Sequence, residues 1–113
     1  ERVAFGKPIG KFEGIQFKFA DMSAEIRAME LLTYDTARMK VAGKRHTLEA
    51  AQTKLFSATR CTQICLECQQ VLGGNGYSKE YDVERLIRDA RGWCVMEGST
   101  EILRMIVSGT VLA

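Results

Sequence analysis

The sequence predicts an all-α protein, an antiparallel up-and-down helical bundle that forms one domain over residues 1–113. Apolar residues recur at steps of three and four along most of the chain, and no useful stretch alternates with period two. The single proline is Pro8, so helix breakers are scarce after the first ten residues. A chain of 113 residues is long enough for one domain and no more.

The first long helix is expected over residues 15–42, after an irregular opening rich in glycine. Gly43 is expected to end this helix, because glycine adopts the left-handed conformation common at helix C-termini. The predicted inward face consists of Ile15, Phe19, Met22, Ile26, Met29, Thr33 and Ala37.

A second helix is expected to begin at Thr47, whose hydroxyl can cap it, and to end at the glycines of residues 73–76. Small residues along it favour close approach of a neighbouring helix. Its predicted inward face consists of Leu48, Ala51, Leu55, Ala58, Thr62, Cys65, Gln69 and Leu72.

A third, shorter helix is expected over residues 83–91, with Leu86 and Ala90 inward. Its charges at spacings of three and four predict either a solvated ion-pair face or an arginine held inward by a carboxylate. Trp93, just after it, is expected to anchor the packing. A fourth helix is expected to start near Thr100, with inward residues Ile102, Leu103 and Ile106.

Composition excludes several classes of function. Hydrophobic residues make up 46% of the chain, charged residues make up 27%, and the net charge is +2, which does not favour nucleic acid as a partner. No apolar run approaches the roughly 20 residues of a membrane span, and no signal peptide is visible. The chain does not open on methionine, which suggests a cut or processed polypeptide.

Three of the four cysteines, Cys61, Cys65 and Cys68, have the spacing of the iron–sulfur motif in radical enzymes that use S-adenosylmethionine. They fall within one helical segment, however, and extend its apolar face. Free cysteine packs well as a small hydrophobe. We therefore expect reduced, unmetallated thiols, and likewise no metal role for His46, the only histidine.

Two segments contain candidate functional residues. Glu97 is followed by a glycine, two hydroxyl residues and a helical pattern, so it is either a poised general base beside a helix N-terminus or a solvated loop carboxylate. Residues 70–77 contain three glycines within four positions, which allows positive φ and close approach of another molecule to bare backbone. A helix C-cap with a tight turn is the alternative.

Five segments then occur in a fixed order: RVAFGKPI at residues 2–9, QFKFADM at 16–22, QVLGGNGY at 70–77, ERLIRDA at 84–90 and EGSTEI at 97–102. Together they closely resemble the C-terminal helical domain of the acyl-CoA dehydrogenases, and the resemblance extends over the whole chain. It implies that the first helix of the family's bundle is largely missing here.

The resemblance implies an oxidoreductase that dehydrogenates the α and β carbons of an acyl-CoA thioester. Glu97 matches the family's general base, which removes the α-proton while the β-hydride passes to FAD. Gly98 matches the position that leaves room for the thioester. Such a base is expected in a water-poor cleft, where a carboxylate becomes a stronger base.

The resemblance also implies contacts to FAD. Arg2 matches the arginine at the FAD pyrophosphate, and Phe5 matches the aromatic residue near the adenine end. The turn that receives the adenosine part of FAD from a neighbouring subunit is matched by Gln70, Val71, Leu72, Gly73 and Gly74. The segment on the flavin side is matched by Ser99, Thr100 and Glu101.

Partners and context follow from the same resemblance: an electron-transfer flavoprotein as electron acceptor, a homodimer or homotetramer, a role in fatty acid metabolism, and the bacterial cytoplasm or the mitochondrial matrix. The family's N-terminal helical domain and flavin-covering β-domain are absent from the chain. The isolated 113-residue chain is therefore expected to be a folded oligomer without flavin or activity. The alternative is a non-catalytic bundle that serves subunit assembly.

Overall fold

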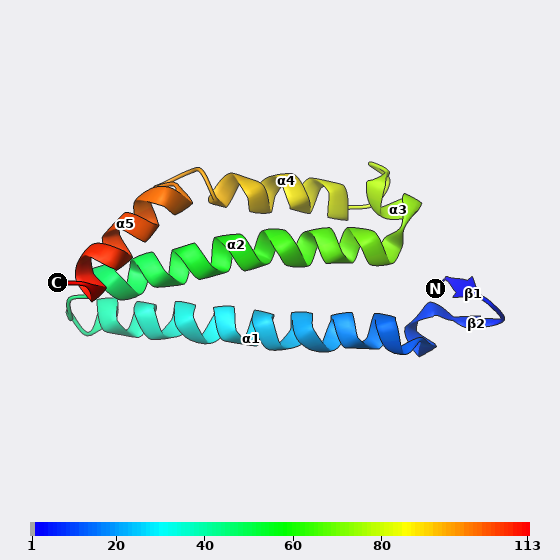
Figure 1. The fold of residues 1–113 in the computed structure, drawn as a ribbon, viewed down its shortest axis with the longest axis horizontal. Helices are drawn as coiled ribbons and strands as arrows, with labels where there is room; N and C mark the ends of the chain where they lie inside the picture. The colour runs from blue at the N-terminus through cyan, green and yellow to red at the C-terminus, as the bar shows by residue number, and fades with distance from the viewer. Residues whose placement is uncertain (1) are drawn as a thin grey trace.

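The computed structural model describes residues 2–113 as three antiparallel rows of helix with α2 in the middle (Figure 1). Helix α1 (Glu13–Val41) forms one outer row, and α2 (Thr47–Leu72) runs back beside it. Helices α4 (Val83–Trp93) and α5 (Thr100–Val111) follow one another along the other side of α2. The all-α, up-and-down architecture is as predicted, and the molecule is elongated, measuring 57 × 26 × 24 Å.

The opening segment contains a small hairpin that periodicity did not predict. Strand β1 (Val3–Ala4) pairs antiparallel with β2 (Lys7–Pro8), and a short 3-10 helix, η1 (Ile9–Lys11), leads into α1. Phe5 and Gly6 join the strands with φ values of 51° and 78°, the positive pair of a type I′ turn. Strands of two residues are too short to leave a period in the sequence.

The turn between α1 and α2 has the hydrogen bonds of a Schellman motif. Gly43 has φ 67°, its N–H donates to the Lys40 carbonyl at 3.1 Å, and the Lys44 N–H donates to the Met39 carbonyl at 3.0 Å. The predicted end of the first helix at Gly43 is therefore confirmed.

The start of α2 differs from the prediction by one residue. His46 is its N-cap, no side chain caps it, and Thr47 is already helical. The His46 Nδ1 atom lies 2.8 Å from the Lys44 carbonyl oxygen, so the ring folds back on the turn. The expected capping by the Thr47 hydroxyl is wrong because the chain enters the helix one residue earlier.

Helix α2 contacts elements on both of its sides. Toward α1, the hydroxyls of Thr36 and Thr53 lie 2.8 Å apart, and Arg60 forms an ion pair with Glu25. Toward α4, the Cys94 thiol donates to the Ala58 carbonyl at 3.4 Å. Small side chains at these contacts let the helices approach closely. The buried apolar residues are Met22, Ala51, Ala58, Val83, Ala90, Cys94 and Leu103.

The inward faces of the last two long helices differ from the prediction. In α4 Ala90 is buried as expected, but Leu86 is 44% exposed and Val83 is buried instead. In α5 Leu103 is buried at 6% exposure, whereas Ile102 and Ile106 are exposed. Because α4 and α5 pack mainly against α2, each buries a narrower stripe than a helix enclosed on several sides.

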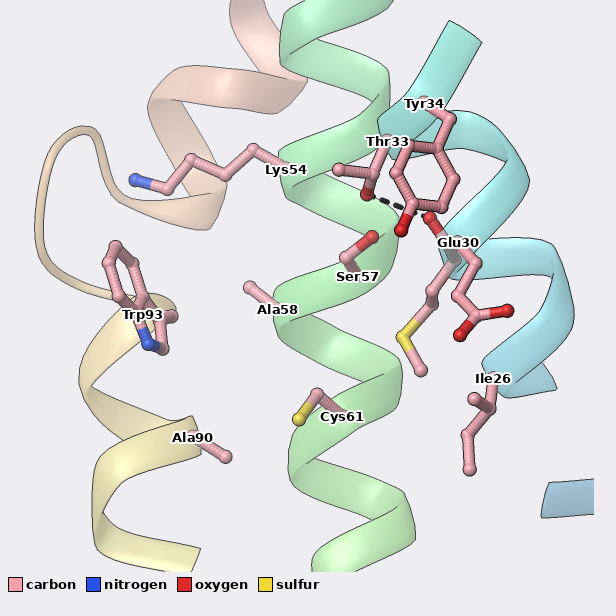
Figure 2. A pocket seen from close by; sticks show the side chains of 11 residues that line it. Ile26, Glu30, Thr33, Tyr34, Lys54, Ser57, Ala58, Cys61, Ala90 and Trp93 are labelled. Carbon is pink, nitrogen blue, oxygen red and sulfur yellow. Dashed lines mark hydrogen bonds between the residues drawn. The ribbon is translucent and has the colours of Figure 1, made fainter. Parts of the chain in front are cut away.

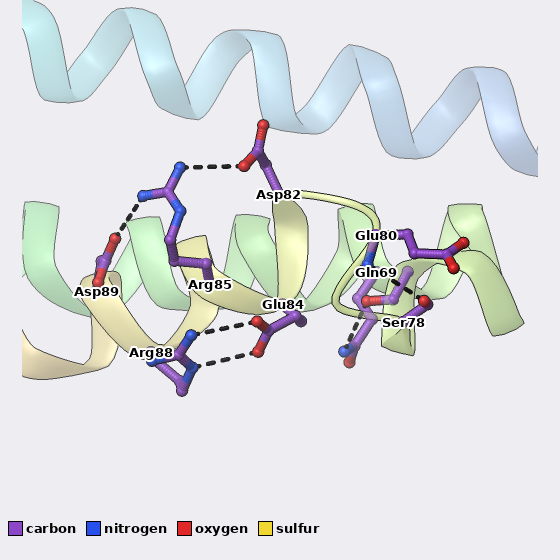
Figure 3. Close-up of polar contacts among 9 residues, drawn as sticks. Gln69, Ser78, Glu80, Asp82, Glu84, Arg85, Arg88 and Asp89 are labelled. Carbon is purple, nitrogen blue, oxygen red and sulfur yellow. Dashed lines mark hydrogen bonds and ion pairs between the residues drawn. The ribbon is translucent and has the colours of Figure 1, made fainter.

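Helix α4 presents a solvated ion-pair face, the first of the two predicted alternatives (Figure 3). Arg85 bonds to Asp89 at 2.9 Å and to Asp82 at 3.3 Å, and Arg88 makes two bonds of 3.2 Å to Glu84. The hydrogen bonds from Arg88 hold the pKa of Glu84 below its usual value and raise the pKa of Arg88. Arg88 faces solvent and Glu84 is only half-buried, so this pair contributes little to stability.

An apolar groove runs along the α1–α2 interface and reaches the end of α4 (Figure 2). It has a volume of about 470 Å³. Two residues expected to be buried border it and remain exposed, Ile26 at 44% and Trp93 at 55%. The expectation that Trp93 anchors the packing is wrong for this chain. Much of the predicted inward face of α1 is likewise open, with Phe19 at 52% exposure and Met22 the one buried residue of this helix.

Within residues 2–113, no helix combines the length and the apolar character needed to cross a bilayer.

Candidate active site

The loop between α4 and α5 contains the predicted general base. Two consecutive residues in it, Glu97 and Gly98, have left-handed backbones with φ values of 55° and 98°. A non-glycine residue in this region is strained, and such strain clusters at functional sites. The Glu97 side chain is exposed in this chain, so the expected water-poor cleft is not formed by residues 2–113 alone.

Lys54 of α2 is hydrogen-bonded to the backbone of this loop. Its ammonium donates to the carbonyl oxygens of Met96, of Glu97 at 2.7 Å and of Gly98 at 3.0 Å. Sequence reasoning missed Lys54. A signal was available, because a lysine at position 54 falls in helical register with the small residues Ala51, Ala58 and Cys61, where a charged side chain needs a specific partner.

Ser99 begins α5 as its N-cap, and its hydroxyl accepts from the Ile102 N–H at 3.5 Å. The Thr100 hydroxyl donates to the Glu101 carboxylate at 3.0 Å, and Arg104 donates to the same oxygen at 3.2 Å. The backbone N–H of Glu101, followed by the Thr100 hydroxyl, holds the pKa of Glu101 below its usual value. The three predicted flavin-side residues therefore lie together at one helix N-terminus.

The glycine turn lies at the other end of α2, and its glycines are under different structural constraints. Gly73 has φ 60°, so it supplies the left-handed residue that ends α2. Gly76 lies in the short helix α3 (Gly74–Tyr77), where a Cβ would lie 2.6 Å from the Gln69 carbonyl oxygen. Gly74 has neither constraint: its φ is not positive, and a Cβ would meet nothing within 4 Å.

The positive φ that these glycines allow is therefore used at Gly73 and not at Gly74. Nothing in residues 2–113 requires a glycine at position 74, which leaves bare backbone there accessible to another molecule.

Arg2 lies beside this turn, although 71 positions separate it from Gly73. Its Nη1 atom is 3.0 Å from the place of a Cβ on Gly73, and Val71 and Leu72 line the same surface hollow. The predicted pyrophosphate and adenosine contacts therefore lie together. Phe5, on the hairpin turn, is 96% exposed and touches Phe12 edge-on, with ring centroids 6.2 Å apart.

The two clusters are distant from each other (Figure 1). Gly73, the C-cap of α2, lies 19 positions after Lys54, which corresponds to about 28 Å at the rise of an α-helix. Glu97 with Ser99, Thr100 and Glu101 therefore forms one cluster, and Arg2 with residues 70–74 forms another. One bound cofactor would reach both clusters of the same chain only in an extended conformation.

Two of the four cysteines contact a neighbouring helix, Cys68 toward α1 and Cys94 toward α2. Cys94 is buried, and the Cys68 thiol lies 3.7 Å from the Met22 sulfur. Burial first, and then the neighbouring Cys61 thiol, raises the pKa of Cys65 to about 11. Across residues 2–113, no group of three metal-ligating side chains is suitably placed to hold an ion.

Comparison with known proteins identifies this arrangement. The family model described as the acyl-CoA dehydrogenase C-terminal domain matches residues 1–112. The chain belongs to the acyl-CoA dehydrogenase family. The short-chain specific mitochondrial acyl-CoA dehydrogenase of Bos taurus is 44% identical over 111 residues, which are 98% of this chain and 27% of that protein.

The chain is similar to two further proteins over nearly its whole length. The caffeyl-CoA reductase–Etf complex subunit CarC of Acetobacterium woodii is 40% identical over 99% of this chain and 30% of its own length. The butyryl-CoA dehydrogenase structure of Megasphaera elsdenii has a TM-score of 0.97 at 41% identity, covering 100% of this chain and 30% of that one. The chain thus spans about 30% of these relatives.

Proposed function

We propose that the chain is the C-terminal domain, over residues 1–113, of an enzyme that dehydrogenates an acyl-CoA thioester across its α and β carbons, with Glu97 as the general base. The single observation that carries the proposal is the left-handed pair Glu97–Gly98 between two helix ends. It turns the Glu97 carboxylate outward from the bundle at a point of backbone strain. The reaction proposed from the family assignment requires a base, and this carboxylate is the proposed one.

In this proposal the Glu97 carboxylate accepts the α-proton of the thioester. A lone base for a weak carbon acid contributes most when it is close to the proton and partly dehydrated. Gly98 adds no side chain beside it, and a Cβ there would be 3.9 Å from Leu103, so the substrate can approach without displacing a group of this chain. FAD, when bound, would accept the β-hydrogen as hydride.

Arg2, Phe5 and residues 70–74 would hold the adenosine and pyrophosphate end of FAD. The residues present fit that group: Arg2 offers a cation for the phosphates, Gly74 offers bare backbone, and Phe5 offers a fully exposed ring. Ser99, Thr100 and Glu101 would face the flavin end, where Ser99 and Thr100 present hydroxyls near a helix N-terminus.

The separation of the two clusters along α2 supports an arrangement in which they serve two different FAD molecules. The glycine cluster would then receive the adenosine part of FAD from a neighbouring subunit in a homodimer or homotetramer. An electron-transfer flavoprotein is the proposed acceptor, a class named in the Acetobacterium woodii relative. The proposed compartment is the bacterial cytoplasm or the mitochondrial matrix.

The test is Glu97→Gln in the full-length enzyme, with Glu80→Gln as a control at an exposed carboxylate remote from the loop. Turnover of a saturated acyl-CoA should fall by a factor on the order of a thousand, since the lone base is lost. Flavin content should be unchanged, because the adenosine-binding cluster is untouched. Near-normal turnover of Glu97→Gln would transfer the role of base to another residue.

A non-catalytic bundle for subunit assembly is the second candidate. The apolar groove and the exposed side chains of Phe17 and Leu31 on α1 favour it, because such faces are normally covered in an assembly. A visible absorption spectrum of the intact protein separates the two candidates. Flavin bands support the enzyme, and their absence after FAD is supplied supports the assembly role.

A further inference from the structure

The Lys54 ammonium meets three consecutive backbone carbonyls of the loop that contains Glu97. Figure 2 shows the side chain leaving α2 toward the connection between α4 and α5. Its Nζ donates to Met96, to Glu97 at 2.7 Å and to Gly98 at 3.0 Å. An ammonium has three N–H groups, so these three carbonyls account for all its donors.

The loop needs such a restraint. Glu97 and Gly98 both have positive φ, and strained conformations persist only where the surroundings over-determine them. Backbone bonds fix the two ends of the loop, with Met96 N–H donating to Gly92 at 2.9 Å and Thr100 N–H donating to Cys94 at 3.0 Å. Between these ends, the carbonyls of Glu97 and Gly98 accept from Lys54.

We propose that Lys54 is a positioning residue for the general base. By fixing the carbonyls on both sides of the Glu97 α-carbon, it sets where the Glu97 carboxylate stands relative to the α-carbon of the substrate. The inference rests on the proposed role of Glu97. A displacement of about 1 Å can cost a factor on the order of a hundred in rate, so a loose loop would remain folded and lose catalysis.

The surroundings of Lys54 favour positioning over a generic surface charge. The side chain is half-buried and lines the apolar groove beside Ser57 and Trp93. None of the ion pairs described within residues 2–113 includes it. Removing the ammonium therefore frees loop carbonyls to meet water and leaves no buried carboxylate unpaired, so Lys54→Met is expected to fold.

The experiment compares Lys54→Met, Lys54→Arg and Glu97→Gln in the full-length, FAD-loaded enzyme. Lys18→Met is the control, since Lys18 of α1 forms an ion pair with Glu67 of α2 and does not contact the loop. Besides the steady-state kcat and KM and the melting temperature, two quantities are measured: the rate constant of flavin reduction per bound flavin with a saturating acyl-CoA, and hydrogen exchange of the backbone amides in residues 92–103.

Lys54→Met should reduce flavin about 10- to 100-fold more slowly, with KM changed far less than kcat and exchange in residues 92–103 accelerated. Lys54→Arg retains a cation and several donors, so it should recover part of the rate. Lys18→Met should match the parent in both measurements. Because the adenosine contacts lie at the opposite end of α2, flavin content should be constant throughout.

Two failures are distinguishable. If Glu97→Gln keeps its rate, Glu97 is not the base, and Lys54 cannot then be the positioning residue of the base. This conclusion holds even if accelerated exchange in Lys54→Met shows that Lys54 restrains the loop. If Glu97→Gln is inactive while Lys54→Met has parental exchange and a parental rate per flavin, the positioning role alone is overturned. A lower melting temperature with an unchanged rate per flavin would also overturn it, by assigning Lys54 to stability only.

Discussion

The guanidinium of Arg2 lies against Gly73, with its Nη1 atom 3.0 Å from the position that a Cβ on Gly73 would occupy. The hairpin at the start of the chain is thus placed over the turn that ends α2. A cation and a stretch of bare backbone become neighbours, which is the combination that a pyrophosphate with an attached nucleoside requires.

Arg2→Ala in the full-length enzyme should weaken FAD binding by about 1.5–3 kcal/mol, the range for a hydrogen bond to a charged group. Titration of the apoprotein with FAD, followed by flavin absorbance, measures the change. Lys11→Ala, an exposed cation in η1, is the control and should bind as the parent does. Equal affinity in Arg2→Ala would remove Arg2 from the cofactor site.

Gly74→Val should release FAD while leaving the isolated bundle intact. A Cβ at position 74 meets nothing within 4 Å, so the chain accommodates the side chain, but a branched group would block approach of a ligand to the backbone. Flavin content of the purified full-length variant and its circular dichroism spectrum check both halves. Full flavin occupancy would show that the cofactor does not approach this residue.

Gly76→Ala should destabilise the full-length protein by about 1–3 kcal/mol, the usual cost of overpacking. The added Cβ would lie 2.6 Å from the Gln69 carbonyl oxygen and 3.0 Å from the Leu72 Cβ, so α3 would have to move away from α2. Urea unfolding measures the difference, with Gly74→Ala as the control that should cause no loss. Equal stability of the two variants would contradict the packing role given to Gly76.

Cys65 should react slowly with iodoacetamide. Its pKa is raised to about 11, first by burial and then by the neighbouring Cys61 thiol. At pH 8 the thiolate is therefore scarce, and alkylation should be slower by a factor on the order of a hundred than in the urea-unfolded chain. The rate should rise about tenfold per pH unit until the pH nears that pKa.

The raised pKa of Cys65 also makes the stability of the fold depend on pH. A thiol with a raised folded-state pKa stabilises the fold fully below the pKa of the unfolded thiol, and this contribution is lost as pH rises from there to about 11.

For the alkylation of Cys65, mass spectrometry of the alkylated protein identifies the modified residue. Rapid modification of Cys65 at pH 8 would contradict the burial, and stoichiometric iron with sulfide would overturn core packing for Cys61, Cys65 and Cys68.

The isolated 113-residue chain should be a helical oligomer that binds no flavin. Its groove and the exposed faces of α1 leave apolar surface that a second copy can cover. Only the adenosine and pyrophosphate end of FAD would find partners in it. Sedimentation monitored at both protein and flavin wavelengths tests the two statements together. A strictly monomeric species, or stoichiometric FAD, would contradict them.

The long helices were predictable because the helical spacing of their apolar residues ends where a glycine stops the helix. Gly43 ends α1 with both bonds of a Schellman motif, and Gly73 ends α2 with positive φ, so two glycines defined the central hairpin from sequence. The fine inward faces were less predictable. Ile102 and Leu103 are adjacent and both apolar, and only the direction from which α2 approaches decides that Leu103 is buried.

The residues of the candidate site were likewise predictable only in part. Glu97 and the glycine turn were visible as motifs. Lys54 was visible only as a charge in register with small residues, and the sequence did not indicate its partners, because backbone carbonyls have no side-chain signature. The contact between Arg2 and Gly73 also depends on how the hairpin folds back, which local sequence does not encode. Residues 2–113 leave Glu97 exposed, so this part of the chain does not by itself form the water-poor cleft expected around a base.

Helix α2 has a fixed length between Lys54, which is bonded to the loop that contains Glu97, and Gly73 at the glycine turn. Inserting one residue between them would rotate one cluster by about 100° relative to the other and shift it by about 1.5 Å. Each cluster would remain locally intact, yet the two would face different directions. Evolution of this segment can therefore proceed by exchanging side chains far more easily than by changing the number of residues, and α2 sets the spacing of the whole domain.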